Sequence, residues 1–443
     1  MGKNYKHRTY LDPIHGPIEL NLKDSAEYLI SRIIDTKEFQ RLRRIRQMGL
    51  GWFTFHGAEH TRFGHSLGTF FIAKKMFAHL LRTYPEIKKY KKEILLSSVL
   101  HDIGHGPFSH TSEKLTNISH EIWTKKIITG NSEVNNLLTR HDKNLPLKLV
   151  EIFESKVKQI FLSQIISGYI DCDRLDYLHR DSYYVGVPYG LTGSERIIAS
   201  LEICKGRGRG EVTSPLLAVN ESVGLDAVIH YLHARYSMYR QVYQHKKNLA
   251  SDFLLLKIID RARESEPQGM PEALKIWLDC KKSQVSKVNA DFYIEVDDVL
   301  LMSAVQNWAN NSFIDKVLHD LSARFVSRKI FKSLEFREKI KKEKIKEILE
   351  KLSSISKQKG LDKGYFGIER SGNKPYEPYT PKGYKTGKAI FIKQQNGSIK
   401  ELSHLSGLVN ALTRENVVKT CLVFAPELED EITNIKGFQE LFK

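Results

Sequence analysis

Histidine and aspartate gather at the end of an apolar run in the stretch EILLSSVLHDIGHGPFSHTSEKL, residues 93–115. His101 and Asp102 adjoin just before a glycine, and His105 and His110 follow within nine residues. A carboxylate at the end of a buried helix is costly unless a partner neutralises it. This pairing of imidazole and carboxylate therefore favours a divalent metal ion as the partner.

Two residues from other helices complete a candidate ligand set. His65 stands at the entry of a helix predicted over residues 66–81, and Asp173 lies in a later predicted helix. With His101 and Asp102 they offer two imidazoles and two carboxylates, a set suited to magnesium, manganese, iron or zinc. The absence of cysteine from the set disfavours a structural zinc site. A single histidine in a helix is more often a core residue whose hydrogen bonds are made within the protein. The adjacent pair, together with His65 and Asp173, favours a metal site instead.

The composition limits the partners and the compartment. The chain has 443 residues, enough for a large core and an appendage. Lys and Arg number 69 and Asp and Glu 52, so the net charge is +17, which implies anionic partners such as nucleotides, nucleic acid or an acidic protein surface. The four cysteines are widely spaced and form no CxxC pair: Cys172, Cys204, Cys280 and Cys421.

Widely spaced cysteines argue against a disulfide framework and for a reducing compartment. We find no signal-peptide pattern at the N-terminus and no apolar run near the ~20 residues that a spanning helix needs. We therefore expect a cytoplasmic protein with no membrane partner.

The elements that must position these groups are mainly helices. Residues 8–22 predict a strand, a turn and a second strand. A helix is predicted over 36–49, another over 93–103 and a loop over 104–123, and residues 221–262 predict a long helix or a helix pair. Four arginines fan over the 36–49 helix, either as solvated charge or as a face for an anion: Arg41, Arg43, Arg44 and Arg46.

The chain divides into three parts by composition. Residues 1–336 form the predicted core, 337–360 a Lys/Glu-rich connector helix, and 361–443 a small α+β lobe. Within the core, residues 204–219 predict a basic β-hairpin insertion. The lobe begins with a predicted loop, continues with a hairpin around Asn396-Gly397 and includes the strand VVKTCLVF.

Several motifs, in order along the chain, resemble a known family. TRFGHSLG, HDIGHGPFSH and DCDRLDYLHRD are similar to the HD superfamily of metal-dependent phosphohydrolases. DPIHGPIEL, IIDTKEFQRLRRIRQMG and YRQVYQHK narrow the resemblance to the deoxynucleoside triphosphate (dNTP) triphosphohydrolases, across about residues 8–260. The resemblance implies a mainly α fold: an HD-domain helical core with a short N-terminal β-hairpin and a small C-terminal α+β lobe. It also implies hydrolysis of a dNTP to a deoxynucleoside and inorganic triphosphate.

The resemblance carries roles onto individual residues. His65, His101, Asp102 and Asp173 match the family's metal ligands. The catalytic positions near the α-phosphate match His105, His120 and Glu113, the last standing where the family commonly has aspartate. The substrate-binding positions match Gln47, Arg62, His110, Arg174, Tyr177, Asp181, Arg235, Tyr239, Tyr243 and His245.

The chemistry of these side chains agrees with the implied roles. Arg62, Arg174 and Arg235 match triphosphate contacts, and guanidinium groups bind phosphate oxygens bidentately. Gln47 and Asp181 match residues that hydrogen-bond the sugar 3′-hydroxyl. The matched tyrosine, Tyr177, packs on the sugar and leaves no room for a 2′-hydroxyl, whereas Tyr239 replaces a common histidine. In the implied reaction water attacks the α-phosphorus, and a histidine such as His120 protonates the leaving 5′-oxygen.

The resemblance further implies regulation, because activating nucleotides in the family bind at subunit junctions of a tetramer. We therefore expect a homotetramer activated by GTP or dGTP. The matched positions are Arg8, Asp35, Gln40 and Arg43, with Arg328 and Lys332 as possible partners.

Two other functions compete with the dNTP triphosphohydrolase. One is an HD-type phosphodiesterase or nuclease acting on nucleic acid or another nucleotide, which the positive charge would suit. The other is a non-enzymatic nucleic-acid-binding protein with a vestigial site, which the intact ligand set disfavours. Gln47, Asp181 and Tyr177 favour the dNTP enzyme, since a strand-binding site needs no closed pocket for a 3′-hydroxyl.

Overall fold

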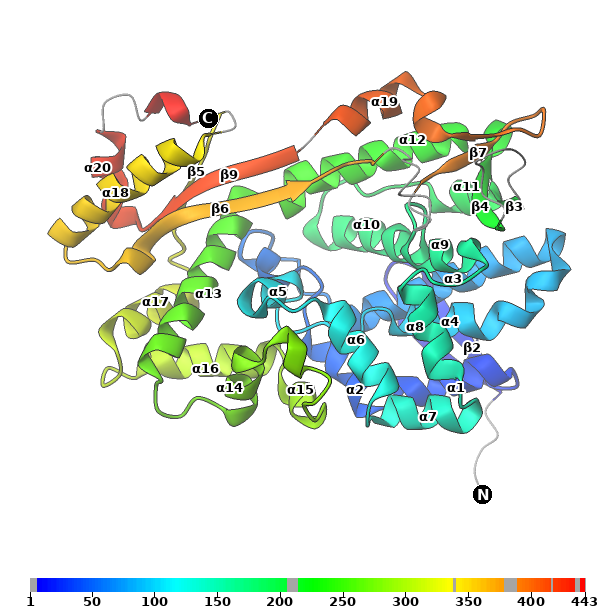
Figure 1. Cartoon of the computed structure of the whole chain (residues 1–443), viewed down its shortest axis with the longest axis horizontal. Helices are drawn as coiled ribbons and strands as arrows, with labels where there is room; N and C mark the ends of the chain where they lie inside the picture. Colours follow the sequence, from blue (N-terminus) through cyan, green and yellow to red (C-terminus); the bar gives the residue numbers. More distant parts are fainter. Residues whose placement is uncertain are drawn as a thin grey trace.

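A computed structural model of the chain describes residues 6–204, 214–337, 340–377, 389–415, 417–434 and 439–442. The fold is mainly helical, with an N-terminal hairpin and small sheets, as predicted (Figure 1). One end of the elongated molecule holds the helices of the first half of the chain. The other end holds α13 to α18 and α20, and the long strands β6 and β9 run along one side toward α12 and α19 (Figure 1).

The first half of the chain supplies the hairpin and a run of packed helices. Their bounds are β1 (His7–Asp12), β2 (Gly16–Asn21), α1 (Ser25–Ile34), α2 (Lys37–Arg41), α3 (Arg62–Thr83), α4 (Lys91–Leu100), α5 (His110–Thr116), α6 (His120–Thr129), α7 (Glu133–His141), α8 (Leu145–Phe153), α9 (Ile160–Ser167), α10 (Cys172–Val185) and α11 (Ser194–Ala199).

The second half adds further helices and two small sheets. Their bounds are β3 (Leu201–Cys204), β4 (Leu216–Asn220), α12 (Glu221–Met238), α13 (Lys246–Ser265), α14 (Glu272–Asp279), α15 (Asp291–Glu295), α16 (Asp298–Asn310), α17 (Lys316–Val326), β5 (Lys332–Glu335), α18 (Lys342–Gln358), β6 (Phe366–Asn373), β7 (Phe391–Lys393), β8 (Ile399–Glu401), α19 (Gly407–Arg414), β9 (Val417–Phe424) and α20 (Glu429–Thr433).

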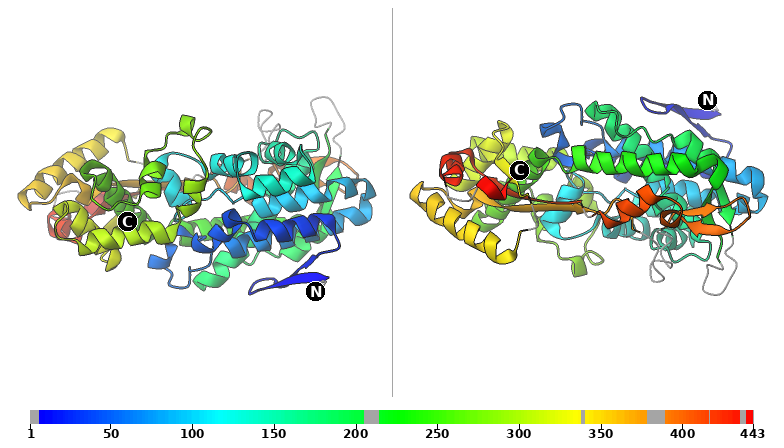
Figure 2. Two further views of the ribbon diagram at one scale, coloured as in Figure 1. Left: turned by 90° about the horizontal axis from the view of Figure 1, so that it is seen from below. Right: turned by 90° about the horizontal axis from the view of Figure 1, so that it is seen from above.

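The strands form three separate sheets. β1 and β2 pair antiparallel as the predicted N-terminal hairpin, which stands out from the helical body (Figure 2). β3 and β4 pair antiparallel on either side of the predicted insertion, whose residues 205–213 lie outside the described part of the chain. β7 then pairs parallel with β4 and antiparallel with β8, so the predicted hairpin around Asn396-Gly397 is confirmed and is joined to the core.

The C-terminal region contributes to two sheets: β7 and β8 join the core sheet with β3 and β4, and β6 and β9 form another sheet with β5. β9 pairs antiparallel with both β6 and β5. These strands, with α18 and α20, bury a small apolar cluster that includes Leu352, Phe366, Leu422 and Ile432. The loop predicted over 364–387 instead contains β6 in its first part, because β9 supplies the partner for its backbone groups. Residues 378–387 of that prediction lie outside the described part of the chain. The α+β lobe is confirmed, and the division of the chain at 336 and 360 stays a prediction.

The helix predicted over 36–49 is wrong beyond Arg41, where α2 ends. A 3-10 turn follows and the chain then extends, so that the N–H of Gln47 donates to the carbonyl of His60 at 3.0 Å. The backbone between α2 and α3 pairs with another extended segment, and these groups are not available for helical hydrogen bonds.

The arginines of this segment contact the protein itself. Arg41 is buried and donates to main-chain carbonyls, Arg44 pairs with Asp297, and Arg46 pairs with Glu59 at 2.7 Å. Each of these three side chains therefore has acceptors within the protein, while Arg44 and Arg46 also stay partly exposed to solvent.

Two boundaries near the candidate site also differ from the prediction. α3 begins at Arg62, before the predicted start at residue 66. The predicted loop over 104–123 contains α5 and the start of α6, because local caps end one helix and begin the next. Asn117 closes α5 in a left-handed conformation, and the side chain of Ser119 accepts a hydrogen bond at the start of α6.

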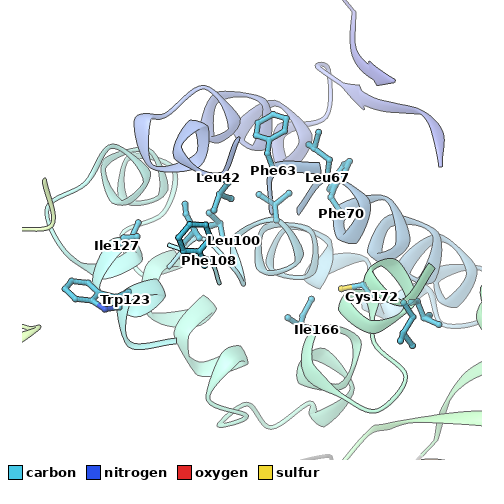
Figure 3. Packing of buried hydrophobic residues seen from close by; sticks show 14 of the residues in the cluster. Leu42, Phe63, Leu67, Phe70, Leu100, Phe108, Trp123, Ile127, Ile166 and Cys172 are labelled. Atoms are coloured by element: carbon cyan, nitrogen blue, oxygen red, sulfur yellow. The ribbon is translucent and has the colours of Figure 1, made fainter. Parts of the chain in front are cut away.

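A continuous apolar core fixes the helices that carry the site. Phe70 of α3, Leu100 of α4 and Cys172 of α10 lie in one buried cluster (Figure 3). Each of the four cysteines is a buried free thiol. Among the described helices, none has both the length and the hydropathy to cross a bilayer.

α3 and α10 approach closely at Gly68. A Cβ at this position would lie 1.8 Å from Asp176 Oδ1 and 2.5 Å from Arg180 Nη2. Only glycine lets the two helices meet here while the carboxylate and the guanidinium stay buried between them.

We expect Gly68→Ala to lower the free energy of unfolding by about 1–3 kcal/mol, because the added methyl overpacks this helix contact. Chemical denaturation measures the change. Gly407→Ala is the matched control, since its Cβ would meet nothing within 4 Å at the start of α19. Equal stability of Gly68→Ala and wild type would contradict the close contact.

Candidate active site

The four predicted metal ligands converge on one point. His65 lies on α3, His101 and Asp102 follow the end of α4, and Asp173 lies in the first turn of α10. His65 Nε2 is 3.4 Å from Asp102 Oδ2 and 3.1 Å from Asp173 Oδ1. His101 Nε2 is 3.4 Å from Asp102 Oδ1 and 3.6 Å from Asp173 Oδ1. Two imidazoles and two carboxylates, from α3, the end of α4 and α10, thus face one another with 3.1–3.6 Å between nitrogen and oxygen atoms. One ion could contact all four.

The other edge of each imidazole is anchored, which leaves one nitrogen free for a metal. Nδ1 of His65 bonds Asp176 Oδ2 at 2.8 Å, and Nδ1 of His101 bonds the carbonyl of Ser98 at 2.8 Å. Both Nε2 atoms are buried and make no hydrogen bond within the described part of the chain. Metal-binding histidines are held in this way, with the second nitrogen donating to a carboxylate or carbonyl. The residues therefore fit a divalent ion.

The electrostatics of this cluster require a cation. Burial lowers the pKa of His65, but Asp102, Asp173 and Asp176 outweigh it and hold that pKa well above its usual range. Burial likewise raises the pKa of Asp173, but the adjacent imidazoles of His101 and His65 bring it below its usual range. The carboxylates thus stay ionised against the cost of burial, and a divalent ion can replace the protons as their counter-charge.

A second cluster adjoins the first through Asp102. The rings of His105 and His120 stack with centroids 3.7 Å apart, and Asp102 Oδ1 lies 3.3 Å from His105 Nε2. Glu113 bonds His120 Nδ1 at 2.5 Å and contacts His110 Nδ1 at 3.4 Å. His105, His110, Glu113 and His120 are themselves close enough to hold an ion, so this group suits either a metal or proton transfer.

The charge states within the second cluster are set by burial and neighbours. Burial, Arg62 and His120 hold the pKa of His105 well below its usual range, so this imidazole stays neutral. Burial raises the pKa of Glu113, but hydrogen bonds with His110 and His120 lower it below its usual range. An ionised Glu113 that orients His120 is the arrangement expected beside a histidine that transfers a proton.

Arg62 lies between the two clusters. Its guanidinium donates to Asp102, and its Nε donates to Ser109 Oγ at 2.9 Å. This predicted phosphate contact is buried at the point where a bound anion would meet the metal. The helix α3 therefore presents both Arg62 and His65 to the same site.

Tyrosine side chains lie beside the predicted metal ligands. The Tyr177 ring lies 6.5 Å from the His65 ring and 6.2 Å from the Tyr243 ring, measured between centroids. The Tyr243 hydroxyl donates to Asp181 Oδ2 at 2.7 Å, and Asp181 Oδ1 bonds His60 Nε2 at 2.7 Å. The predicted sugar contacts Tyr177 and Asp181 are thus joined through Tyr243 in a chain that leads away from the predicted metal ligands.

The other two predicted triphosphate contacts, a partly exposed Arg174 and a buried Arg235, are incompletely satisfied. Arg174 donates to Asp171 and to the carbonyl of Gly168, and Arg235 donates to the carbonyl of Pro375. The Nε groups of both arginines are buried without an acceptor among the described residues. The Arg235 guanidinium also lies 5.1 Å from the Tyr239 ring centroid.

Comparison with known proteins identifies the family. Residues 62–181 match the HD domain, and this span contains all four predicted metal ligands. The uncharacterized protein YwfO of Bacillus subtilis is 35% identical over 418 residues, which cover 93% of this chain and 90% of YwfO. A phosphohydrolase from Bacteroides thetaiotaomicron has a crystal structure 30% identical in sequence, with a TM-score of 0.77 over 94% of this chain and 99% of that one. The chain belongs to the HD-domain phosphohydrolases.

More distant relatives have a named activity. The deoxynucleoside triphosphate triphosphohydrolase SAMHD1 of Homo sapiens is 31% identical over 271 residues, and that of Danio rerio is 30% identical over 276 residues. These matches cover 53% and 54% of this chain but only 41% and 42% of the SAMHD1 proteins. This HD phosphohydrolase takes a divalent metal as its cofactor, and its His/Asp cluster fits one.

Some predicted residues lie apart from the site. His245 caps α13, and its ring lies 5.8 Å from the Phe55 ring, between centroids. Gln47 is buried, and its main-chain N–H donates to the carbonyl of His60. Its side-chain Oε1 has no hydrogen bond among the described residues.

The predicted nucleotide-activator residues of this HD phosphohydrolase form two groups. Arg8 pairs with Asp35 at 2.7 Å, and Arg43 donates to Gln40 Oε1 at 2.9 Å. Tyr10 and Phe63 link the two pairs, because Arg8 lies over the ring of Tyr10 and Arg43 over that of Phe63. The second group makes other contacts: Arg328 donates to the carbonyl of Phe53, and Lys332 pairs with Glu429.

Sequence reasoning missed the side chains that anchor the ligands from behind. Asp176, which holds His65, also bonds His15 at 2.6 Å and Arg180, and Arg180 pairs with Asp12 at 2.8 Å. The HD phosphohydrolase thereby ties its N-terminal hairpin to a metal ligand. The i, i+3 spacing of Asp173 and Asp176 on one helix face could have indicated the role of Asp176. His60 has no such local signal.

We expect Asp173→Ala to reduce the bound metal from wild-type content to nearly none, because it removes a ligand and leaves the imidazoles without their counter-charge. Elemental analysis of the purified protein measures this loss. Asp181→Ala, on the same helix, is the matched control and should retain the metal. Wild-type metal content in Asp173→Ala would remove Asp173 from the ligand set.

Proposed function

We propose that this protein is a cytoplasmic dNTP triphosphohydrolase, which cleaves a dNTP to a deoxynucleoside and inorganic triphosphate. The observation that carries the proposal is the continuity of the site. The predicted metal ligands, the histidine cluster and the tyrosine side chains adjoin one another through Asp102 and Tyr177. The similarity to SAMHD1, named for this activity, supports the same substrate class.

The arginines of the site support a substrate with several phosphates. Arg174 and Arg235 each keep an Nε–H without an acceptor in the described structure, although burial makes such a group costly. Phosphate oxygens would satisfy these donors, and guanidinium groups suit them in geometry and charge. Arg62, already beside Asp102, would contact the phosphate next to the metal.

The tyrosine side chains and Asp181 support a deoxyribose at the other end of the substrate. Tyr177 provides a flat apolar wall beside His65, so a sugar packed on it would lose the solvation of any 2′-hydroxyl. Asp181, fixed by His60 and Tyr243, offers an acceptor for a 3′-hydroxyl. A strand-binding phosphodiesterase would need the site open at that position.

The residues then divide the reaction between them. A divalent ion at the His/Asp cluster would polarise a phosphate and make a nearby water more acidic. Water adds to the α-phosphorus, the bond from phosphorus to the 5′-oxygen breaks, and triphosphate leaves whole. His120, oriented by Glu113, gives its proton to the 5′-oxygen, while the proton of the water passes to solvent. Neutral His105, stacked on His120, contributes a second polar group beside the α-phosphate.

We also propose that the active enzyme is a homotetramer with a nucleotide bound at a subunit junction. Arg8, Asp35, Gln40 and Arg43 form one connected polar group on the protein, and guanidinium pairs of this kind suit a phosphate or a guanine edge. Arg328 and Lys332 lie in the other group and would belong to the same junction only across two subunits.

The purified protein is incubated with each of the four dNTPs, with and without GTP or dGTP. We expect inorganic tripolyphosphate and a deoxynucleoside as products, because water attacks the α-phosphorus. Ion-exchange chromatography of the products measures this. A phosphodiesterase or nuclease instead yields nucleoside monophosphates and no tripolyphosphate. Stimulation by GTP or dGTP would support the activator site, whereas hyperbolic kinetics with one pure dNTP and no response to either nucleotide would count against it.

His120→Ala should abolish turnover while the metal stays bound, because His120 supplies a proton and is not among the four ligands of the ion. The expected loss in kcat is about 10²–10⁴-fold. Full activity in this variant would remove His120 from the chemistry, and loss of the metal would instead place His120 among its ligands.

A further inference from the structure

The loop between Asp102 and His110 has an unusual backbone. Phe108 and Ser109 both have positive φ, 54° and 55°, although neither is glycine. L-residues rarely adopt this conformation, and two in succession persist only when surrounding groups hold them. The loop carries His105, which stacks on His120, and Ser109, which accepts from Arg62. Its shape therefore sets the position of two side chains in the site.

Three buried side chains each hold one main-chain group of this loop. The Tyr293 hydroxyl donates to the carbonyl of Gly104 at 2.7 Å. Arg41 Nη1 donates to the carbonyl of His105 at 2.7 Å. The N–H of Phe108 donates to Asp298 Oδ1 at 2.7 Å.

The three holders are themselves linked. Arg41 lies over the Tyr293 ring, 4.5 Å from its centroid, and donates twice to the carbonyl of Val296. Tyr293 stacks on Trp123 with centroids 4.0 Å apart. The second oxygen of Asp298 accepts from the N–H of Arg46 at 2.9 Å. Such mutual packing and bonding leaves little freedom to the loop that they bind.

The loop also packs from within. Phe108 belongs to the same buried cluster as Leu42 and Leu100, so its side chain anchors the loop in the core (Figure 3). The side chains that hold the backbone come from outside the HD match at 62–181. The site thus depends on α2, which carries Arg41, and on α15 and α16, which carry Tyr293 and Asp298.

We propose that Arg41, Tyr293 and Asp298 are positioning residues that impose the strained shape of residues 104–109 and thereby the placement of His105 and Ser109. None of the three is among the predicted substrate contacts, so their effect passes through the loop. The inference concerns the loop itself and rests on the proposed function only for the substrate used to measure turnover.

Two variants with matched controls test the proposal. Asp298→Asn keeps one acceptor oxygen and loses the other, whereas Asp297→Asn alters the neighbouring acid, which contacts Arg44 and Leu300 instead. Tyr293→Phe removes one buried hydroxyl, and so does Tyr365→Phe, whose hydroxyl bonds Asp320 at 2.6 Å. A test variant and its control lose similar interactions. Only Asp298→Asn and Tyr293→Phe, however, remove a hydrogen bond to the 104–109 loop.

Hydrogen–deuterium exchange read by mass spectrometry reports the loop without any substrate. We expect peptides that cover 104–109 to exchange about tenfold faster in Asp298→Asn and Tyr293→Phe, since a buried hydrogen bond is lost. The two controls should exchange as wild type does there. Unchanged exchange in both test variants would overturn the proposal, and the milder Tyr293→Phe decides it if Asp298→Asn unfolds.

Measurements of kcat and KM distinguish an effect on the position of the loop from a general loss of stability. In both test variants kcat should fall by roughly 10- to 100-fold, as small displacements of reacting groups do, with KM and bound metal at wild-type levels. The controls should keep wild-type kcat. Wild-type kcat in Asp298→Asn and Tyr293→Phe would overturn the proposal while leaving the proposed function intact. If wild type releases no tripolyphosphate from dNTPs, the proposed function fails, and the exchange measurement still decides this inference.

Discussion

The structure depends on gathering two carboxylates and two imidazoles at one largely buried point where three helices meet. Asp102 and Asp173 bring negative charge into the core, and His65 and His101 point their free Nε2 atoms at it. A divalent cation would neutralise the negative charge of the two carboxylates, which a neutral partner cannot do. This matters because burial of an uncompensated carboxylate costs several kcal/mol. The helices α3, α4 and α10 can approach closely only because that charge is compensated.

Asp102 connects the metal ligands to the residues proposed for proton transfer. One oxygen lies near His101 and His105, and the other lies near His65 and receives the Arg62 guanidinium. A single carboxylate thus holds the candidate ion, the predicted phosphate contact Arg62 and the proposed catalytic histidine His105 in fixed relation. The order His-Asp followed by a short glycine-containing loop makes this possible, since the chain turns back immediately after the ligand pair.

The HD region alone does not fix the geometry of the site. The hairpin reaches Asp176 through His15 and Arg180, the segment before α3 supplies His60, and α15 and α16 hold the 104–109 loop. The strands of the last hundred residues also return to the core, where β7 pairs with β4. The long similarity to YwfO, over 93% of this chain, is consistent with a site whose supports are spread along its whole length.

The sequence by itself determined the ligand types, their order and the helices that bear them, because apolar periodicity and the His-Asp pair are local patterns. It also predicted the N-terminal hairpin and the Asn396-Gly397 turn, whose chemistry is contained in a few adjacent residues. Only the tertiary structure decided the ends of α2 and α3, the helices α5 and α6 near the site, and the strand β6. Those outcomes depend on partners outside each element: the extension after α2 pairs with the segment around His60, and β6 requires β9 from much later in the chain. The buried bonds of Arg41 and Asp298 were hidden for the same reason, since a hydrogen bond to a distant main chain leaves no periodic trace in the sequence.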